Sequence, residues 1–356
     1  MLRGLVAALL AAAATAAVAA AAVAPDTRRA GPGPWAAGEV VMGTLTAPPT
    51  PAFLARVRSG KLGGVLLLGS WPSATAVRRV TAQLQEAACV RGEPLLVAVD
   101  QEGGIVKRFP WAAPNLAPAK LGDAARAGSE AAAAAGALQA VGVDVDFAPV
   151  VDTPSSARSF LGSRAFSRSA KTNAQLARAF VAGIQTSGAV AATAKHFPGL
   201  GEAGANTDLS TVVVHAKRWK LNRGLVPFRA AVSRGVDLVM VSSAAYPAFD
   251  PSGLPAVFSK TIETTLLRDG LGFDGVAVTD ALDAPAGRIP HAATKAVAAG
   301  ADLLVFGSER SAEQAFATLA ADAKAYPHLR ARLAEAGARI RALKMRLAAG
   351  GGPSCP

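Results

Sequence analysis

Two segments of the chain place chemically capable side chains directly after an apolar run. Asp280 follows the apolar residues 276–279, and the pair Lys195-His196 follows the apolar residues 190–194. Hydrolysis of a glycosidic bond requires a carboxylate that attacks or stabilises a cation-like centre and an acid that protonates the leaving oxygen. Asp280 is the candidate for this carboxylate. In the alternative interpretation it only caps the following helix.

Lys195 and His196 supply a cation and an imidazole, which suit the binding of sugar hydroxyls or of an amide carbonyl. In the alternative interpretation, Lys195 pairs with an Asp at a neighbouring strand end and His196 belongs to the core. The sequence contains no G-x-S-x-G elbow of a serine hydrolase and no P-loop. Its four histidines are not spaced as metal ligands, so we expect neither a metal nor another cofactor.

Gly199, Gly201 and Gly204 follow the second apolar run in a G-x-G-x-x-G pattern. A dinucleotide site needs a helix that opens at the last glycine and an acidic residue about 20 positions further on. The residues after Gly204 are not helical in pattern, and no acidic residue lies between Asp208 and Asp237. The pattern therefore does not predict a dinucleotide site.

Eight apolar runs, mostly bounded by Gly, Asp or Pro, are typical of parallel strands buried on both faces. They are Val40–Leu45, Gly64–Leu68, Leu95–Val99, Val143–Ala148, Val190–Ala194, Leu238–Val241, Gly275–Thr279 and Leu303–Phe306. Helical patterns alternate with them, for example Ala119–Ala140, Thr172–Ser187, Pro227–Arg234, Thr261–Asp269, Ala292–Ala299, Ser311–Ala323 and Leu329–Leu347. The alternation predicts a single-domain α/β fold, a (β/α)8 barrel of TIM type, with a doubly wound sheet as the alternative.

In such a barrel the active site lies at the carboxyl ends of the strands. Polar residues gather at these ends in the sequence. They are Asp100-Gln101-Glu102-Gly103-Gly104 with Arg108 beyond it, Asp152, Lys195-His196 and Asp280. The opposite ends carry mainly Gly, Pro and surface charges. This asymmetry predicts one site at the mouth of the barrel.

The N-terminal residues have the pattern of a targeting segment. Arg3 is followed by an uncharged run of mainly Ala, Val and Leu that ends at Ala22-Val23-Ala24. A basic start, an apolar run and a small-x-small site predict a secretory signal peptide. The run is also long enough for an uncleaved membrane anchor. The expected parts of the chain are the signal peptide or anchor at 1–24, a linker at 25–35, the barrel at 36–349 and a flexible tail at 350–356.

The composition excludes a disordered chain, since 51% of the residues are hydrophobic and 17% are charged. The 37 Lys and Arg residues outnumber the 25 Asp and Glu residues and give a net charge of +12, which suits an anionic partner such as nucleic acid, anionic lipid or an acidic polymer. The densest basic cluster, Arg330–Arg346, lacks interleaved aromatic residues, so we interpret it as a solvated helix face and expect no nucleic acid. Cys89 and Cys355 either form a disulfide, as an exported chain allows, or remain free thiols.

Four motifs occur in one order between about residues 36 and 310. They are Val99-Asp100-Gln101-Glu102-Gly103-Gly104, Gly142 through Phe147-Ala148-Pro149-Val150-Val151-Asp152, Lys195-His196-Phe197-Pro198-Gly199, and Gly272-Phe273-Asp274-Gly275-Val276 running to Asp280. Together they make the chain resemble glycoside hydrolase family 3, in its single-domain β-N-acetylglucosaminidase branch. The resemblance implies a TIM-type barrel and a retaining double displacement with Asp280 as the nucleophile. It also implies a set of residues that hold the terminal N-acetylglucosamine: Asp100, Arg108, Arg164, Lys195 and His196.

The sequence departs from this branch at the general acid/base. The branch has an Asp-x-His motif whose His lies thirteen residues after the motif Lys, and here Asn206 and Asp208 occupy the two places. A second motif His is replaced by Leu200, and the usual Thr-Ala-His reads Val241-Ser242-Ser243. Ala281 stands where many relatives have an acid after the nucleophile.

Two hypotheses follow from the departure. In the first, Asp208 is the acid/base and Asn206 orients it through a hydrogen bond, while burial and the like charge of Asp280 raise the pKa of Asp208. Glu202, in the same loop, is a second candidate for this role. In the other hypothesis, 206–208 is an ordinary turn and the protein binds sugars without turning them over.

The sequence therefore predicts an exported, retaining, exo-acting glycoside hydrolase that cleaves terminal β-linked N-acetylglucosamine or related sugars from cell-wall-type glycans. The alternative is a catalytically impaired relative that binds sugars or muropeptides. The expected partner is a glycan or a peptidoglycan fragment. A membrane is expected to be involved only through an uncleaved N-terminal segment.

Overall fold

The computed structural model describes residues 35–355, and every structural statement below concerns this part of the chain. The predicted signal peptide or anchor and the predicted linker, up to residue 34, lie outside the described residues. Trp35 already belongs to the first helix, α1 (Trp35–Glu39). Within the described part, no helix is both long enough and apolar enough to cross a membrane.

Eight parallel strands form the centre of the fold. In hydrogen-bonded order they are β10 (Leu304–Val305), β1 (Val41–Leu45), β2 (Gly64–Leu67), β3 (Leu96–Val99), β6 (Val145–Asp146), β7 (Ala191–Phe197), β8 (Leu238–Val241) and β9 (Val276–Thr279). A bridge between Val278 and Leu303 joins the two ends of this order, and the amide of Thr279 donates to the carbonyl of Leu303 over 2.9 Å. The predicted (β/α)8 barrel is confirmed, and the doubly wound alternative is wrong.

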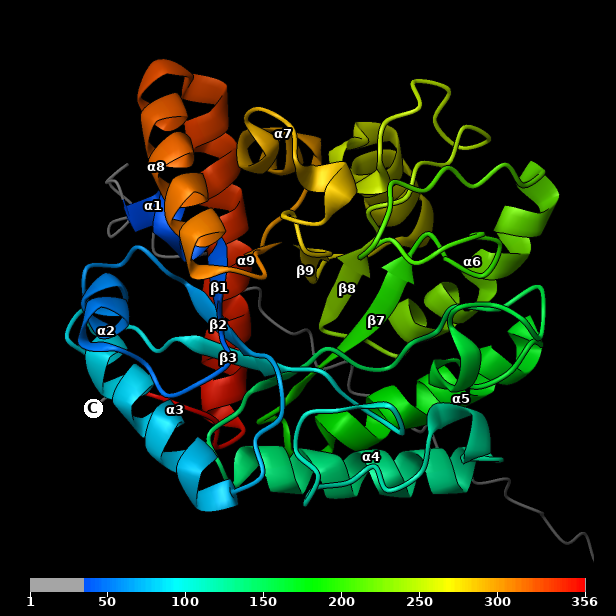
Figure 1. Ribbon diagram of the computed structural model, residues 1–356, viewed down its shortest axis with the longest axis horizontal. Coiled ribbons are helices and arrows are strands. Elements are labelled where there is room, and N and C mark those ends of the chain that lie inside the picture. Colours follow the sequence, from blue (N-terminus) through cyan, green and yellow to red (C-terminus); the bar gives the residue numbers. More distant parts are fainter. Residues whose placement is uncertain (1–34, 356) are drawn as a thin grey trace, which may run out of the picture. The chain divides into compact units, whose positions relative to one another are not determined.

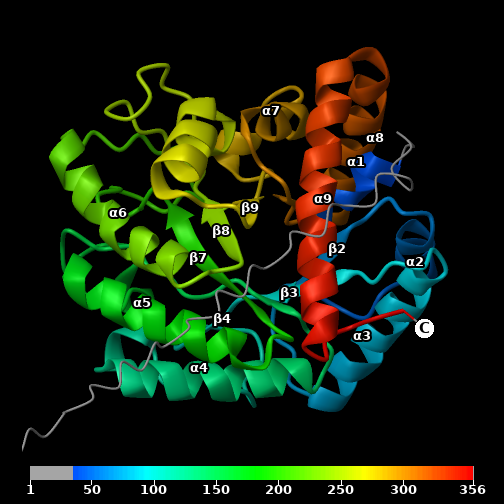
Figure 2. The ribbon, with the colours of Figure 1, turned by 180° about the vertical axis from the view of Figure 1, so that it is seen from behind.

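Helices surround the strands in both views of the ribbon (Figures 1 and 2). The remaining α-helices are α2 (Pro51–Arg58), α3 (Ala74–Cys89), α4 (Ala124–Gln139), α5 (Ala170–Ile184), α6 (Arg218–Ser233), α7 (Ala292–Ala299), α8 (Glu309–Ala325) and α9 (Pro327–Ala349). A short hairpin consists of β4 (Gln101–Gly103) and β5 (Val106–Lys107). The short 3-10 helices are η2 (Pro118–Lys120), η3 (Gly162–Arg164), η4 (Gln185–Ser187), η5 (Ala256–Phe258) and η7 (Pro285–Gly287).

Several predicted boundaries shift in the structure. The strand predicted at 190–194 continues to Phe197, so Lys195 and His196 lie inside β7. The strand predicted at 143–148 keeps its regular pairing only at β6. The helix predicted at 227–234 is the second half of α6, and the segment 261–269 forms the π-helix η6 (Thr261–Asp269).

Local sequence explains where five of the helices begin and how closely two of them pack. A polar side chain before each helix accepts a hydrogen bond from the amide three residues later. These caps are Thr50, Ser73, Asp123, Ser169 and Ser308. A Cβ added to Gly183 in α5 would lie 2.3 Å from the carbonyl oxygen of Gly128 in α4 and 2.7 Å from the Cβ of Ala131. Small residues therefore let α4 and α5 pack closely, which suits a chain with few aromatic residues.

Helix α9 crosses the amino ends of several strands, behind the barrel in Figure 1 and in front of it in Figure 2. Its basic residues bind carboxylates that lie just before β10, β1 and β8. The ion pairs are Arg332 and Arg339 with Asp302, Arg341 with Glu39, and Arg346 with Asp237. The side chains of Arg341 and Arg346 are still 37% and 41% exposed, as predicted for a solvated face, and these ion pairs also attach α9 to the base of the barrel.

A disulfide joins Cys89, the last residue of α3, to Cys355. The amide of Gly352 also donates to the carbonyl of Leu347 over 2.8 Å. The disulfide and this hydrogen bond tie the segment 350–355, predicted as a flexible tail, to the body of the protein. Of the two alternatives for the cysteines, the structure has the disulfide.

Candidate active site

The barrel strands direct the predicted site residues toward the same interior. Lys195 in β7 pairs with Met240 in β8, and Met240 pairs with Val278 in β9. Paired residues of neighbouring parallel strands project to the same side of the sheet, and side chains alternate along a strand. Asp280 comes two residues after Val278, so its carboxylate is on the side of the Lys195 ammonium.

A cluster of alternating charges forms around Lys195. Its Nζ lies 2.7 Å from Oδ1 of Asp100 and 2.7 Å from Oε1 of Glu102. Arg164 binds Glu102 through two hydrogen bonds of 2.9 and 2.8 Å, and Arg108 lies 3.8 Å from Oδ2 of Asp100. The four predicted residues Asp100, Arg108, Arg164 and Lys195 are thus brought together.

Glu102 also belongs to this cluster, although it is not among the predicted site residues. It lies two residues after Asp100 in the same motif, and this spacing is the signal that would have placed both side chains on one side. Burial alone would raise the pKa of Glu102, but Lys195 and Arg164 outweigh it and hold the pKa at about 2. Burial lowers the pKa of Lys195, and the charges of Asp100 and Glu102 more than reverse this. Both Glu102 and Lys195 are therefore charged at neutral pH.

His196 is held by a buried carboxylate. Oδ2 of Asp152 lies 2.7 Å from the ring Nδ1 of His196 and accepts the backbone amide of His196 over 3.1 Å. The other oxygen of Asp152 accepts the amide of Leu200 over 2.6 Å. A carboxylate accepts hydrogen bonds, so Nδ1 carries the hydrogen and Nε2 is left for a ligand.

Asp280 is fixed at the end of β9 by its backbone and one of its oxygens. Its amide donates to the carbonyl of Val241 over 2.8 Å, and its Oδ1 accepts the amide of Ala281 over 2.9 Å. Burial raises the pKa of Asp280, the charge of His196 lowers it, and the negative charge of Asp208 raises it. The loop that carries Asp208 therefore brings this carboxylate within electrostatic reach of Asp280.

Contrary to the prediction, Asn206 does not contact the carboxyl of Asp208. Its Oδ1 accepts the backbone amide of Asp208 over 3.1 Å, and its carbonyl accepts the amides of Leu209 and Ser210. This is the turn geometry that short polar side chains favour. Asn206 therefore fixes the backbone of the loop, and the Asp208 side chain is exposed.

Glu202, the second candidate for the acid/base, points elsewhere. It lines a cavity of about 290 Å³ between the loop 198–202 and the start of α6, and it lies 3.8 Å from Nζ of Lys220. The charges with the largest effect on the pKa of Asp280 are those of His196, Asp208 and Lys195, and not that of Glu202. Asp208 is accordingly the better placed of the two carboxylates.

The positions where the branch has its other histidines are filled by side chains of different chemistry. Leu200 is buried and uses only its amide toward Asp152. Ser243 is also buried, and its hydroxyl has no hydrogen-bond partner in residues 35–355. Next to it, Ser242 lies 3.0 Å from the hydroxyl of Tyr246, which bonds to the carbonyl of Gly199 over 3.2 Å. The sequence offered no signal for Tyr246.

The glycines of the loop after β7 have a packing role. Gly199 has a φ of +126°, and a Cβ added to Gly201 would lie 1.9 Å from the carbonyl oxygen of Thr153. The amide of Ser155 donates to the carbonyl of Gly201 over 2.9 Å. Their spacing therefore reflects the close approach of two loops at the barrel mouth.

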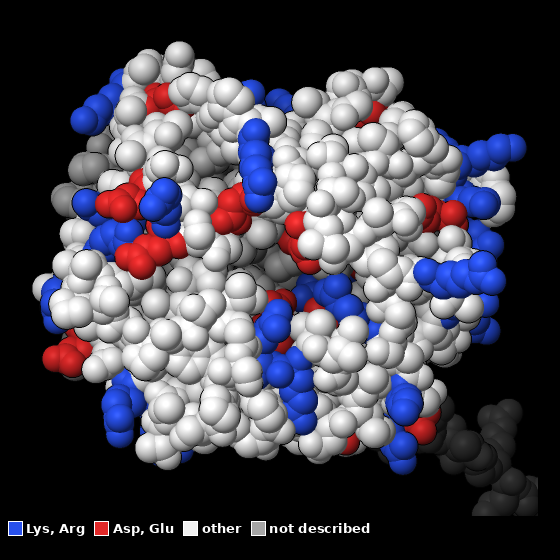
Figure 3. Space-filling view, in the orientation of Figure 1, with Lys and Arg blue, Asp and Glu red and all other residues white. Residues whose placement is uncertain are grey.

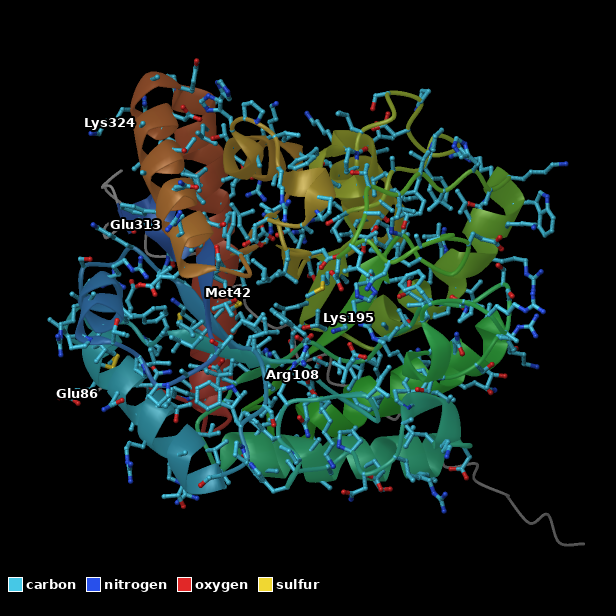
Figure 4. All side chains as sticks on the ribbon, in the orientation of Figure 1. Met42, Glu86, Arg108, Lys195, Glu313 and Lys324 are labelled. Atoms are coloured by element: carbon cyan, nitrogen blue, oxygen red, sulfur yellow. A yellow bond between two sulfur atoms is a disulfide. The ribbon has the colours of Figure 1, made fainter. Side chains whose placement is uncertain are left out.

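In the space-filling view the centre of this face is hollowed, and atoms of both charge types line the hollow (Figure 3). Lys195 and Arg108 lie near this centre in the view with side chains (Figure 4). In the part of the chain that the structure describes, no group of three His, Cys, Asp or Glu side chains could hold a metal ion. The arrangement can bind a polar ligand with charged groups of both signs and present the Asp280 carboxylate to it.

Comparison with known proteins identifies the family. The family model of the "Glycosyl hydrolase family 3 N terminal domain" matches residues 45–343. A "Beta-hexosaminidase" of Nitrosomonas eutropha is 34% identical over 275 residues, which are 72% of this chain and 77% of the relative. An "Uncharacterized secreted glycosyl hydrolase" of Arthroderma benhamiae is 33% identical over 336 residues, which are 88% of this chain and 93% of that protein.

The crystal structure of a beta-N-acetylhexosaminidase from Beutenbergia cavernae superposes with a TM-score of 0.81 at 33% identity, and the match covers 87% of this chain and 98% of that one. The family model spans most of the described residues, and the first relative exceeds 30% identity over most of its length. The fold, the mouth of the barrel and these similarities agree. The chain therefore belongs to glycosyl hydrolase family 3 and is a glycosidase that hydrolyses O-glycosyl bonds.

Proposed function

We propose that the protein is a retaining, exo-acting β-N-acetylhexosaminidase that removes terminal β-linked N-acetylglucosamine, or a related sugar, from cell-wall-type glycans. The observation that carries the proposal is the position of Asp280 at the end of β9, with His196 and Asp208 within electrostatic reach. The names of the relatives, a beta-hexosaminidase and a beta-N-acetylhexosaminidase, support the sugar.

The terminal sugar lies against the charged cluster around Lys195. The side chain of Asp100 is 16% exposed and that of Glu102 is 0% exposed. Asp100 can therefore accept sugar hydroxyls, whereas Glu102 holds Arg164 and Lys195 in place. Arg108, whose side chain is 27% exposed, donates to ring substituents from the open side, and Nε2 of His196 faces the same ligand.

The reaction proceeds in two displacements. An oxygen of Asp280 forms a bond to the anomeric carbon, the bond from that carbon to the leaving oxygen breaks, and the proton of the Asp208 carboxyl moves to the leaving oxygen. In the second displacement, Asp208 takes a proton from water while the water oxygen bonds to the anomeric carbon and Asp280 leaves. Since Oδ1 of Asp280 accepts the Ala281 amide, Oδ2 is the attacking oxygen.

Glu202 remains the second candidate for the proton transfer, although its ion pair with Lys220 disfavours it. The alternative function is a sugar or muropeptide binding protein with impaired turnover. Two observations favour it: Asp208 is exposed, and Asn206 binds its backbone instead of its carboxyl.

Export also belongs to the proposal. The pattern of residues 1–24 is that of a signal peptide or anchor. The disulfide between Cys89 and Cys355 suits an oxidising compartment outside the cytoplasm, and a relative is named as secreted.

The test is hydrolysis of an aryl β-N-acetylglucosaminide with an acidic phenol, which leaves without much help from an acid. The protein should hydrolyse it, Asp280→Asn should abolish turnover, and nuclear magnetic resonance should show the β-anomer as the first sugar product. An α-anomer would contradict the retaining mechanism. Binding of the sugar without turnover would support the binding protein, and neither binding nor turnover would exclude the proposed sugar.

A further inference from the structure

One quarter of the sequence carries most of the net charge of the protein. Between residues 153 and 236 the chain has twelve Lys and Arg residues and two acidic residues, a net +10 of the formal +12. Arg164 and Lys195 belong to the active site, and Arg158 lies in a loop. The other nine are exposed on α5, on α6 and beside these helices, and we call them the basic flank. They are Arg168, Lys171, Arg178, Lys217, Arg218, Lys220, Arg223, Arg229 and Arg234.

The basic flank is not neutralised by neighbouring carboxylates. In residues 35–355, the pair Lys220–Glu202, at 3.8 Å, is the one ion pair that its members make. Four arginines of α9, in contrast, bind carboxylates at the base of the barrel. In the space-filling view, Lys and Arg side chains gather along the right-hand side, where α6 lies in Figure 1. Such a surface attracts polyanions.

The basic flank also contains a cavity. The cavity of about 290 Å³ that contains Glu202 is also lined by Arg168, Lys220 and Arg223. Trp219 lines it as well and is 55% exposed. An exposed indole offers a flat apolar surface to a sugar ring, and Arg and Lys donate to carboxylate or phosphate oxygens.

The cavity adjoins the loop that carries the proposed acid/base. Gly199, Gly201 and Glu202 form one wall of the cavity, and the same loop continues to Asp208. The acid/base must contact the oxygen between the terminal sugar and the leaving group, so the leaving group lies on the side of this loop. A polymer that extends beyond the leaving sugar can pass along the cavity and the basic flank.

We propose that the basic flank is a second binding surface for an anionic glycan polymer, with an acidic sugar seated in the cavity beside Trp219. A single-stranded nucleic acid would need successive aromatic platforms, and α5 and α6 expose a single aromatic ring, that of Trp219. The choice of a glycan rests on the proposed function. The binding measurement needs no turnover, however. Glycan binding by the basic flank can therefore fail while the proposed hydrolysis holds, and the reverse.

The experiment measures binding of the protein to immobilised hyaluronan, whose repeat contains N-acetylglucosamine and a carboxylate sugar. The flank variant combines Arg168→Gln, Lys220→Gln and Arg223→Gln. The matched control combines Arg58→Gln, Arg79→Gln and Arg126→Gln, which removes the same charge from exposed sites on α2, α3 and α4. We expect the flank variant to weaken binding by about tenfold and the control by less than about twofold.

Trp219→Ala separates a glycan from any polyanion. It should weaken binding to hyaluronan and leave binding to polyglutamate unchanged, because a peptide has no sugar ring to stack on the indole. Hydrolysis of the aryl substrate should stay unchanged in every variant, which also shows that each one folds.

Three results would overturn the proposal. Equal losses in the flank and control variants would mean that only net charge matters. Tighter binding to duplex DNA or to phosphatidylglycerol vesicles, abolished in the flank variant, would assign the surface to another class of partner. No binding to hyaluronan at low salt would exclude the acidic glycan.

Discussion

One carboxylate oxygen, Oδ2 of Asp152, binds both the ring and the backbone of His196, at 2.7 and 3.1 Å. The ring is therefore fixed in position, with Nδ1 as the donor, by a residue that is itself fully buried. Asp152→Asn keeps the size of the side chain and removes its charge. We expect kcat/KM for the aryl substrate to fall about 10- to 100-fold, the cost of a charge-assisted hydrogen bond. Steady-state kinetics at saturating and limiting substrate measures this loss.

The control for this prediction is Asn173→Ala, because Asn173 contacts the backbone carbonyl of Asp152 and not its carboxylate. It should lower the stability of the loop but leave kcat/KM closer to that of the parent protein. A larger effect from Asn173→Ala than from Asp152→Asn would contradict the role given to the carboxylate.

The electrostatic link between Asp208 and Asp280 predicts a shift in the pH profile. Asp280 must be ionised to attack, so the acidic limb of kcat/KM follows its pKa in the free enzyme. Burial raises this pKa, His196 lowers it and Asp208 raises it. Asp208→Asn removes the negative charge, lowers the pKa of Asp280 and should move the acidic limb to lower pH. His196→Gln should move it to higher pH.

The measurement is the pH dependence of kcat/KM with an acidic phenol as the leaving group, so that loss of the acid/base does not obscure the limb. Glu202→Gln serves as the control, since Glu202 faces Lys220 and should leave the limb in place. If Glu202→Gln shifts the acidic limb and Asp208→Asn does not, Glu202 is the carboxylate whose charge acts on Asp280, and Asp208 is not.

Glu102 predicts a combined effect on stability and binding. It is fully buried and holds Lys195 and Arg164, so Glu102→Gln removes the carboxylate partner of Arg164 and one of the two carboxylate partners of Lys195. The free energy of unfolding should fall by about 3–5 kcal/mol, the cost of breaking a buried ion pair. The relative increase in KM should exceed the relative decrease in kcat, because Glu102 positions sugar-binding groups. Urea denaturation and kinetics on the same preparation test both effects.

The sequence predicts the barrel well because alternation between apolar runs and helical patterns is a local property. It also predicts that Asp100, Lys195 and Asp280 lie at one mouth, because the carboxyl ends of parallel strands gather there. The contacts of Asn206 were not predictable in this way. Which group an Asn side chain binds depends on the turn its own backbone adopts, and here it binds the Asp208 amide.

Long-range partners limit the interpretation of charge patterns. The arginines of α9 have the spacing of a solvated face, yet Arg332 and Arg339 bind Asp302, which precedes β10. Tyr246 likewise reaches Gly199, 47 residues away, and nothing in the sequence near Tyr246 indicates this contact. Such pairs arise from the closure of the barrel, which brings together residues that are far apart in the chain.

The close packing of α4 and α5 predicts opposite effects for two glycines. In Gly183→Ala the new Cβ would meet the carbonyl oxygen of Gly128 at 2.3 Å, so the helices must separate. We expect a loss of about 1–3 kcal/mol in the free energy of unfolding. Gly136→Ala in α4 meets nothing within 4 Å and should gain about 0.5–1 kcal/mol from the lower entropy of the unfolded chain. Thermal denaturation of both variants distinguishes packing from propensity.

The disulfide between Cys89 and Cys355 predicts a stability effect without a catalytic one. It links α3 to the segment after α9, with 266 residues of sequence separation, and α9 crosses the base of the barrel, away from the mouth. Removing it with Cys89→Ser and Cys355→Ser frees the unfolded chain from a long closed loop and should lower the free energy of unfolding by about 2–5 kcal/mol. Hydrolysis of the aryl substrate at 25 °C should be unchanged. A reducing agent should lower the stability of the parent protein by the same amount and leave the double variant unaffected. Loss of activity in the reduced but folded parent protein would instead mean that the base of the barrel is coupled to its mouth.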